Sequence, residues 1–140
     1  MPCRAAFDQL VEGVKKAEYG GRRLKDDPLI RQKIAQISIE LEATQMLSFR
    51  AAWMIANGEI PNYEASMVKM FGTEAQQRMS HIATQIFGLY GQLKKGAPGA
   101  ALDGAVEQQY RAMVMPTFGA GASELQRNII AMRGMGLPAG

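Results

Sequence analysis

The sequence has a single cysteine, Cys3, and a single histidine, His81, among its 140 residues. One cysteine cannot close an intramolecular disulfide, so the chain is not a disulfide-stapled scaffold. One imidazole does not form a zinc site without further ligands, so a histidine-based metal centre is not expected. With 47% hydrophobic and 21% charged residues, the composition is that of an ordinary globular protein, and the length predicts one domain over residues 1–140.

The sequence also lacks a long apolar run. No stretch reaches the roughly 18 consecutive apolar residues that a membrane-spanning helix requires, and residues 1–10 have no apolar core of a signal peptide. The net charge is +3, but the basic residues occur in scattered pairs, with acids between them and no interleaved aromatic side chains. We therefore expect a cytoplasmic protein that binds neither nucleic acid nor membrane.

Apolar residues instead recur every three or four positions, which is the period of amphipathic helices. A first helix is predicted over residues 2–19, and Gly20-Gly21 ends it because glycine accepts the left-handed conformation that closes a helix. A second helix is predicted over residues 28–56. Asp26-Asp27 supplies an N-cap before its first proline, and Asn57-Gly58 ends it.

A third helix follows Pro61-Asn62 and reaches Gly91. One face of this helix is apolar throughout and predicts its buried side: Met67, Phe71, Ala75, Met79, Ile82 and Ile86. The segment 94–102, rich in glycine, alanine and proline, is expected to be a flexible connection.

Two shorter helices are predicted near the C-terminus, over residues 103–114 and 123–132, the latter with Ser123 as its N-cap. No segment alternates apolar and polar residues as a half-buried strand does. The connections between the long helices are short. The sequence therefore predicts an all-α protein, an up-and-down antiparallel four-helix bundle.

Four glutamates on the second and third predicted helices invite comparison with di-iron carboxylate bundles: Glu40, Glu42, Glu64 and Glu74. Those bundles use Glu-x-x-His pairs on facing helices, and no glutamate here is followed by a histidine three residues later. We therefore expect no metal site. His81 is interpreted as a surface or packing residue, Cys3 as unreactive, and the ten methionines as core filler.

Two glycine-bearing stretches carry more information than these titratable residues. Residues 85–91 end the third helix, and residues 118–130 lead through Gly119-Ala-Gly121 into the last one. In the second stretch, the small side chains let a ligand or a neighbouring group approach the backbone just before a helix N-terminus. The free N–H groups at such a terminus favour a negatively charged ligand group. A tight turn between helices with a capping residue is the alternative explanation.

The run Gly121-Ala-Ser-Glu-Leu-Gln-Arg-Asn-Ile-Ile-Ala131 resembles the C-terminal signature of the acyl-CoA dehydrogenases, and Arg133-Gly-Met-Gly-Leu-Pro138 resembles their closing segment. Four other stretches resemble successive parts of the same C-terminal bundle: residues 31–35, 40–43, 50–53 and 69–74. The resemblance covers essentially the whole chain. Residues 26–31 and 118–121 are most similar to bacterial members that act on bulky or branched acyl-CoA thioesters, including steroid side chains.

The resemblance implies oxidation of an acyl-CoA to a 2,3-enoyl-CoA, in which a carboxylate removes the α-proton while FAD accepts the β-hydride. It also implies a homo- or hetero-oligomer with other acyl-CoA dehydrogenase chains, since the family builds its FAD site across subunits. The residues that match cofactor contacts of the family are Gln85 and Gly88 at the end of the third helix, and Gly121, Ser123 and Glu124 before the last one.

Three positions depart from the family pattern. Ala120 stands where many members have the catalytic glutamate, so this chain has no catalytic residue at that position. Ala17 aligns with a flavin-contacting arginine, and Leu89 replaces the second glycine of a Gly-Gly pair. The resemblance further implies that an N-terminal helical domain and a β-domain are absent from the 140 residues, so we expect no turnover by the chain alone.

Three functions remain open at this point. The chain is the C-terminal domain of an acyl-CoA dehydrogenase seen as a split or truncated product, or a non-catalytic partner subunit of a heteromeric enzyme, or a helical interaction module. The short N-terminal part favours the first, and the departures at Ala17, Leu89 and Ala120 favour the second. The third does not explain the run from Ser123 to Asn128.

Overall fold

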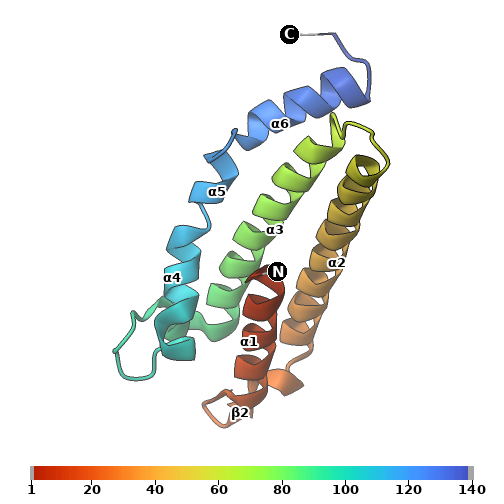
Figure 1. The fold of residues 1–140 in the computed structure, drawn as a ribbon. Coiled ribbons are helices and arrows are strands. Elements are labelled where there is room, and N and C mark those ends of the chain that lie inside the picture. The colour runs from red at the N-terminus through yellow and green to blue at the C-terminus, as the bar shows by residue number, and fades with distance from the viewer. Residues whose placement is uncertain (1, 139–140) are drawn as a thin grey trace.

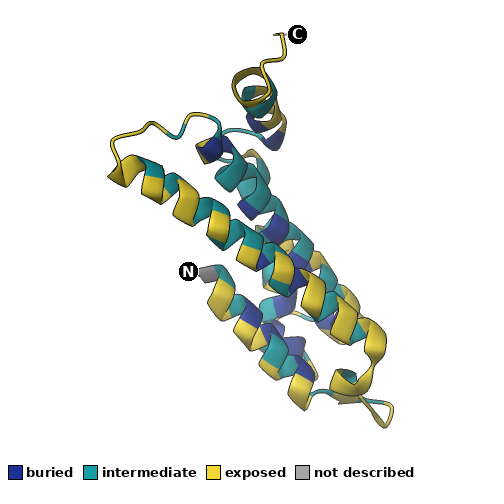
Figure 2. Cartoon of the chain, turned by 90° about the vertical axis from the view of Figure 1, so that its right-hand side faces the viewer, coloured by how far each residue is buried: buried dark blue, intermediate teal, exposed yellow. Residues whose placement is uncertain are grey.

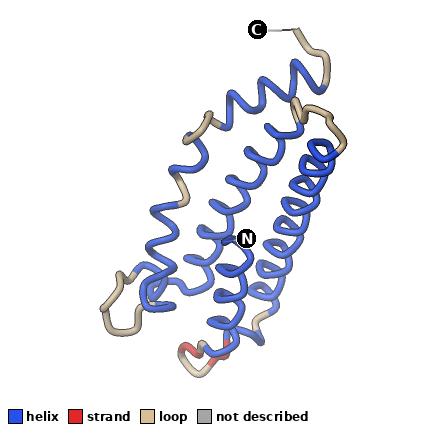
Figure 3. The backbone as a smooth tube through the Cα atoms, in the orientation of Figure 1, coloured by secondary structure: helices blue, strands red, loops and turns tan. Residues whose placement is uncertain are grey.

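Residues 2–138, which the computed structural model describes, form four antiparallel helical rods (Figure 1). The first three rods are α1 (Pro2–Lys16), α2 (Pro28–Ala56) and α3 (Glu64–Phe87). The fourth rod consists of α4 (Ala105–Ala112), α5 (Met115–Phe118) and α6 (Ser123–Ile129), and Figure 3 shows the short loops that interrupt it. The predicted all-α up-and-down bundle is confirmed.

The most extensive contact between helices joins α2 to α3, and two polar contacts across it show the relative direction of the two helices. Arg78 Nε lies 2.8 Å from Glu40 Oε2, and Lys33 Nζ donates a hydrogen bond of 2.8 Å to Gln85 Oε1. Residue numbers thus fall along α2 as they rise along α3, which makes the two helices antiparallel.

The first helix ends three residues earlier than the sequence predicts. After Lys16 the chain forms a two-stranded antiparallel hairpin, in which β1 (Glu18–Tyr19) pairs with β2 (Arg22–Arg23). The turn is made by Gly20 and Gly21, with φ of +59° and +75°, values that glycine adopts at no steric cost. A 3₁₀ turn over Leu24–Asp26 then leads into α2.

The N-terminus of α2 is capped as predicted, by Asp27. Its Oδ1 accepts hydrogen bonds from the backbone N–H groups of Leu29 (2.8 Å) and Ile30 (3.3 Å). We expect Asp27→Ala to lower the free energy of unfolding by about 1 kcal/mol, because these two donors lose their partner. Urea denaturation measures the loss. Asp27→Asn keeps an accepting oxygen, and an equal loss in that variant would contradict the capping role.

The connection over residues 94–102 is a series of hydrogen-bonded turns rather than an unstructured linker. The N–H of Ala97 donates to the carbonyl oxygen of Lys94, and that of Ala100 donates to Ala97. A 3₁₀ turn over Ala101–Gly104 follows, in which three consecutive residues are left-handed: Leu102, Asp103 and Gly104, with φ of +50°, +52° and +81°. The helix predicted over residues 103–114 is therefore shorter than expected, because α4 starts only after Gly104 and ends at Ala112.

The apolar core lies in the half of the bundle that contains α1 and α4 (Figure 2). It is formed by Phe7, Leu10, Val14, Ile37, Leu41, Met79, Ala83, Ile86, Phe87, Ala101 and Val106. The predicted apolar face of α3 is correct over its C-terminal half. Met67 and Phe71, nearer its N-terminus, are only half-buried, because the short helix α6 covers that part of α3 less completely.

The other half of the bundle buries polar side chains. Four of the five buried polar or charged residues belong to it: Glu64, Ser66, Ser123 and Gln126. Its part of α2 exposes a stripe of apolar residues at helical spacing, Met46, Phe49 and Trp53. None of the helices within residues 2–138 has both the length and the apolar content needed to cross a membrane.

Candidate functional site

The candidate site is built around the loop of small residues between α5 and α6, residues 119–122. Ala120 and Gly121 lie in the left-handed region, with φ of +55° and +100°. That conformation costs a non-glycine residue roughly 1–2 kcal/mol, so the contacts around the loop must hold Ala120 in place. At Gly121, a Cβ atom would lie 2.5 Å from the side-chain nitrogen of Gln126, which also favours glycine.

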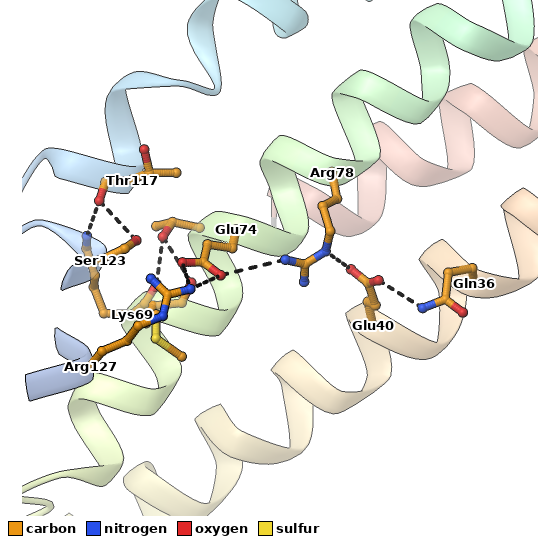
Figure 4. A network of polar contacts seen from close by, with 10 residues as sticks. Gln36, Glu40, Lys69, Glu74, Arg78, Thr117, Ser123 and Arg127 are labelled. Carbon is orange, nitrogen blue, oxygen red and sulfur yellow. Dashed lines mark hydrogen bonds and ion pairs between the residues drawn. The ribbon is translucent and has the colours of Figure 1, made fainter. Parts of the chain in front are cut away.

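Two side chains hold this loop by binding two carbonyl oxygens, one shortly before the loop and one within it (Figure 4). Lys69 on α3 donates from Nζ to the carbonyl oxygen of Thr117, at 3.2 Å, and to that of Gly121. Ser123 Oγ also donates to the carbonyl oxygen of Thr117, at 3.2 Å. The loop is therefore fastened at both ends to α3 and α6.

Ser123 is not the N-cap that the sequence predicts. Ala122 occupies the N-cap position of α6, and no side chain caps the helix. Ser123 is the first helical residue and is buried, and its hydroxyl binds the carbonyl oxygen of Thr117 instead. The serine thus stabilises the loop before the helix rather than the free N–H groups of the helix itself.

A chain of charged side chains extends from this loop across the bundle (Figure 4). Arg127 Nη2 on α6 lies 2.8 Å from Glu74 Oε1 on α3, and Arg78 Nη1 lies 3.7 Å from Glu74 Oε2. Arg78 reaches Glu40 on α2, and Gln36 Nε2 donates to the other oxygen of Glu40 at 2.9 Å. The network links α6, α3 and α2.

Each of the four glutamates that the sequence offered as metal ligands lies beside a cation. Glu40 and Glu74 bind arginines, and the two others also lie beside cations: Arg4 Nη1 is 3.1 Å from Glu42 Oε1, and Arg50 Nη2 is 3.5 Å from Glu64 Oε1. Across residues 2–138 no three histidine, cysteine or acidic side chains are grouped as metal ligands would be.

A surface hollow of about 320 Å³ lies beside the loop and leaves it accessible. It is lined by Glu74, Gln77, Arg78, Thr117, Phe118, Ser123, Glu124 and Arg127. Ala120 is exposed, and Gly121 and Ala122 are half-buried, so the backbone of the loop is reachable from outside. Ala120, which the sequence resemblance places at a catalytic glutamate, carries only a methyl group and therefore no acid or base.

Gln85 and Gly88 lie in a second region, at the opposite end of α3. Gln85 lies 16 positions after Lys69 on α3, which is about 24 Å along the helix axis. Gln85 is exposed, accepts the hydrogen bond from Lys33 and places Nε2 2.9 Å from Nε2 of His81. Gly88 is exposed with φ of +54°. The five predicted cofactor residues therefore form two groups rather than one site.

An aromatic pair stands next to this second group. The rings of Tyr19 and Tyr90 are stacked, with centroids 4.3 Å apart and planes 10° apart. Burial raises the pKa of the Tyr19 hydroxyl above its usual value, and the neighbouring Tyr90 raises it further. Tyr19 also borders a surface hollow of about 630 Å³, which is lined by Arg22 and Arg23 of the hairpin as well. The sequence pattern assigned Tyr19 to a helix end and did not reveal the pair.

His81 is exposed, as the sequence predicts for a surface or packing residue. Its ring centroid lies 6.0 Å from that of Tyr110 on α4, with a tilt of 31° between the planes. It therefore helps to pack α3 against the fourth rod.

Comparison with known proteins shows where this fold and loop occur. Residues 1–135 match the family model for the acyl-CoA dehydrogenase C-terminal domain. The chain belongs to the acyl-CoA dehydrogenase family. The family predicted from the run that begins at Gly121 is thus confirmed, and a helical module unrelated to the family is ruled out.

Individual members of the family agree with this assignment. Acyl-CoA dehydrogenase FadE26 of Mycobacterium tuberculosis is 33% identical over an alignment of 140 residues, which covers 97% of this chain and 34% of that protein. The structure of the Tcur3481-Tcur3483 steroid ACAD matches at a TM-score of 0.87 and 28% identity, covering 99% of this chain and 35% of that one. The ChsE4-ChsE5 complex from Mycobacterium tuberculosis matches at a TM-score of 0.87 and 29% identity, covering 99% and 36%.

These acyl-CoA dehydrogenases are much longer than the present chain. The chain spans about a third of the length of each, 34% to 36%. The matched third is the C-terminal helical domain of the family.

Proposed function

We propose that the chain serves as the C-terminal helical domain of a flavin-dependent acyl-CoA dehydrogenase, to which it supplies FAD contacts and an oligomer surface. The observation that carries this proposal is the accessible loop at residues 119–122 within a chain of this family. FAD, when bound, would accept the hydride released in the 2,3-dehydrogenation of an acyl-CoA thioester. This chain would bind and orient, and would not turn over substrate alone.

The residues present fit a dinucleotide in both regions. Next to the loop, the guanidinium groups of Arg78 and Arg127 border the hollow, and cations of this kind suit phosphate oxygens. At the other end of α3, Gln85 and Gly88 are exposed and offer a side-chain amide and an uncrowded backbone. Because Lys69, which holds the loop, and Gln85 are about 24 Å apart along α3, we propose that the two regions contact separate portions of the cofactor, or two cofactor molecules of an oligomer.

The exposed apolar stripe on α2 supports the proposed oligomer. Met46, Phe49 and Trp53 are all more than half exposed, and large contiguous apolar patches of this kind are typical of protein interfaces. The partner that we propose is another acyl-CoA dehydrogenase chain, either a copy of this one or a different subunit.

A non-catalytic subunit of a heteromeric enzyme is the second candidate function. Ala120 provides no base, Ala17 provides no guanidinium for a flavin, and Leu89 is 79% exposed where the family has a glycine. The similarity to the ChsE4-ChsE5 complex supports this candidate, since that structure contains two different chains. A reading frame upstream of the Met1 codon that encodes the two other domains in frame would favour a single split enzyme instead.

The test of the proposed function is flavin binding with and without the rest of the enzyme. The chain is purified alone and together with a chain that carries the other two-thirds of a relative. Absorbance is then recorded at about 450 nm, where oxidised flavin absorbs. We expect a colourless chain alone and a yellow assembly. Yellow protein from the chain alone would contradict the need for a partner, and an assembly that forms without flavin would contradict the FAD contacts.

Two matched variants sharpen this test. Gln85→Ala is expected to lower the flavin content of the assembly, because Gln85 lies in one of the two proposed contact regions. Gln32→Ala removes the same amide from an exposed position on α2 that has no proposed contact, and it should leave the flavin content unchanged. Equal flavin content in both variants would remove Gln85 from the site.

A further inference from the structure

Lys69 differs from the other cations near the loop in what it binds. Arg78 and Arg127 bind carboxylates, whereas no ion pair of Lys69 occurs within residues 2–138. Its ammonium, partly buried between α3 and the loop, donates to the carbonyl oxygens of Thr117 and Gly121. A charged donor makes stronger hydrogen bonds than a neutral one, so both bonds hold the backbone firmly.

The two acceptors of Lys69 enclose a short exposed segment, residues 118–120. Phe118 is 60% exposed and Ala120 is exposed, so burial does little to set the position of this segment. Ala120 also has a left-handed backbone, which an alanine in a free loop would rarely keep. A backbone bond from the N–H of Gly119 to the carbonyl oxygen of Met115, at 2.9 Å, holds the start of the segment. Among side-chain hydrogen bonds within residues 2–138, only those of Lys69 and of the Ser123 hydroxyl reach the backbone of residues 117–121, and Ser123 binds only Thr117.

We propose that Lys69 is a positioning residue, which holds residues 118–120 at the edge of the hollow by binding the carbonyl oxygens on either side of them. This inference rests on the proposed function, in which the hollow receives part of the cofactor. Lys69 is not among the residues that line the hollow, and its ammonium faces the backbone of the loop, so the proposed role acts through the loop (Figure 4).

A purely structural role for Lys69 would have a different signature. The apolar core lies in the other half of the bundle, so global stability depends little on this loop. A positioning role changes the loop alone, and local opening of such a loop is seen as faster amide hydrogen exchange. The two roles therefore separate when local exchange and global unfolding are measured on the same variants.

The first arm of the test uses the full chain alone. Lys69→Met removes the ammonium and keeps most of the side-chain length, and we expect amide exchange in residues 118–123 to rise by about tenfold with a small change in the unfolding midpoint. Lys33→Met is the control, because Lys33 binds only the side chain of Gln85. It should leave the loop unchanged. Lys69→Arg keeps a cationic donor and should restore part of the protection.

Two results of this arm would overturn the proposal. One is exchange in residues 118–123 that stays within about twofold of the parent chain in Lys69→Met. The other is exchange that rises equally throughout the chain, which would show that Lys69 only contributes to overall stability.

The second arm measures FAD affinity in the assembly of the preceding test. We expect Lys69→Met to weaken FAD binding by about tenfold and Lys69→Arg to recover part of it. The control in this arm is Lys15→Met, which removes an exposed lysine that pairs with Glu12 on α1 and should leave FAD binding unchanged. Equal affinity of Lys69→Met and the parent would refute the positioning role. If the parent assembly binds no FAD, the proposed function fails, and hydrogen exchange still decides whether Lys69 holds the loop.

Discussion

Replacing Gly104 with alanine is expected to lower the free energy of unfolding by about 3–5 kcal/mol. A Cβ atom at this position would lie 2.6 Å from the Cα of Lys95 and 2.8 Å from the carbonyl carbon of Lys94, and it would overlap the backbone nitrogen of Lys95. These are backbone atoms, so no rotation of a side chain relieves the overlap. The residue also has φ of +81°. Urea denaturation with a two-state fit measures the loss.

The matched control for this variant is Gly96→Ala. Gly96 has almost the same backbone conformation, with φ of +85°, but a Cβ atom there meets nothing within 4 Å. Its expected cost is therefore the backbone term alone, about 1–2 kcal/mol. Equal losses in the two variants would show that the close approach of Lys95 to Gly104 does not contribute.

Phe87→Ala is expected to cost about 3–5 kcal/mol, because it removes a large ring from the centre of the core. Phe87 is 3% exposed, and its ring tip lies 3.3 Å from where a Cβ atom of Gly13 would stand, so α1 packs closely against it. Alanine would leave a cavity beside the backbone of α1, and such a cavity adds to the lost burial of the ring. Urea denaturation at constant pH gives the value.

Phe71→Ala on the same helix is the comparison. Phe71 is half-buried, and its ring receives the guanidinium of Arg78 at 5.7 Å from the ring centroid. Its loss should cost about 1–2 kcal/mol, from partial burial and a cation–π contact. If Phe71→Ala proves more destabilising than Phe87→Ala, the core has been assigned to the wrong half of the bundle.

The long helices could be predicted from sequence because their local signals agree. α2 begins at Pro28 and ends at Ala56 as predicted, since Asp27 caps one end and Asn57-Gly58 closes the other. The apolar spacing of α3 also identified its buried face, but only where a partner helix covers it. Periodicity shows which side of a helix is apolar, and the length of the neighbouring helices decides how much of that side is buried.

The fourth rod was less predictable. The helix expected over residues 103–114 begins instead at Ala105, because three left-handed residues precede it, and the last helix passes into a π-helical turn over Ile130–Gly134. α5 has four residues, which are too few to show a helical period. Gly104 inside the predicted helix was the one local sign of the break.

The candidate site was located by its motif, but the group that holds it was not. The run that starts at Gly121 marks the loop, whereas Lys69 lies 48 and 52 residues before the carbonyl groups that it binds. A lysine in an amphipathic helix is ordinarily a solvated residue, so no local pattern distinguishes it. Lys69 does stand in one of the stretches that resemble the family, residues 69–74.

The unequal burial of the two halves has a thermodynamic consequence. Hydrocarbon that becomes hydrated raises the heat capacity of a protein, and polar groups that become hydrated lower it. If α6 were to lift from α3, the groups wetted would include the polar Glu74, Ser123 and Gln126 beside the half-buried Met67 and Phe71, so this step would add less to the heat capacity than opening the core. The enthalpy of opening the loop end would then change less with temperature than the enthalpy of opening the core around Phe87.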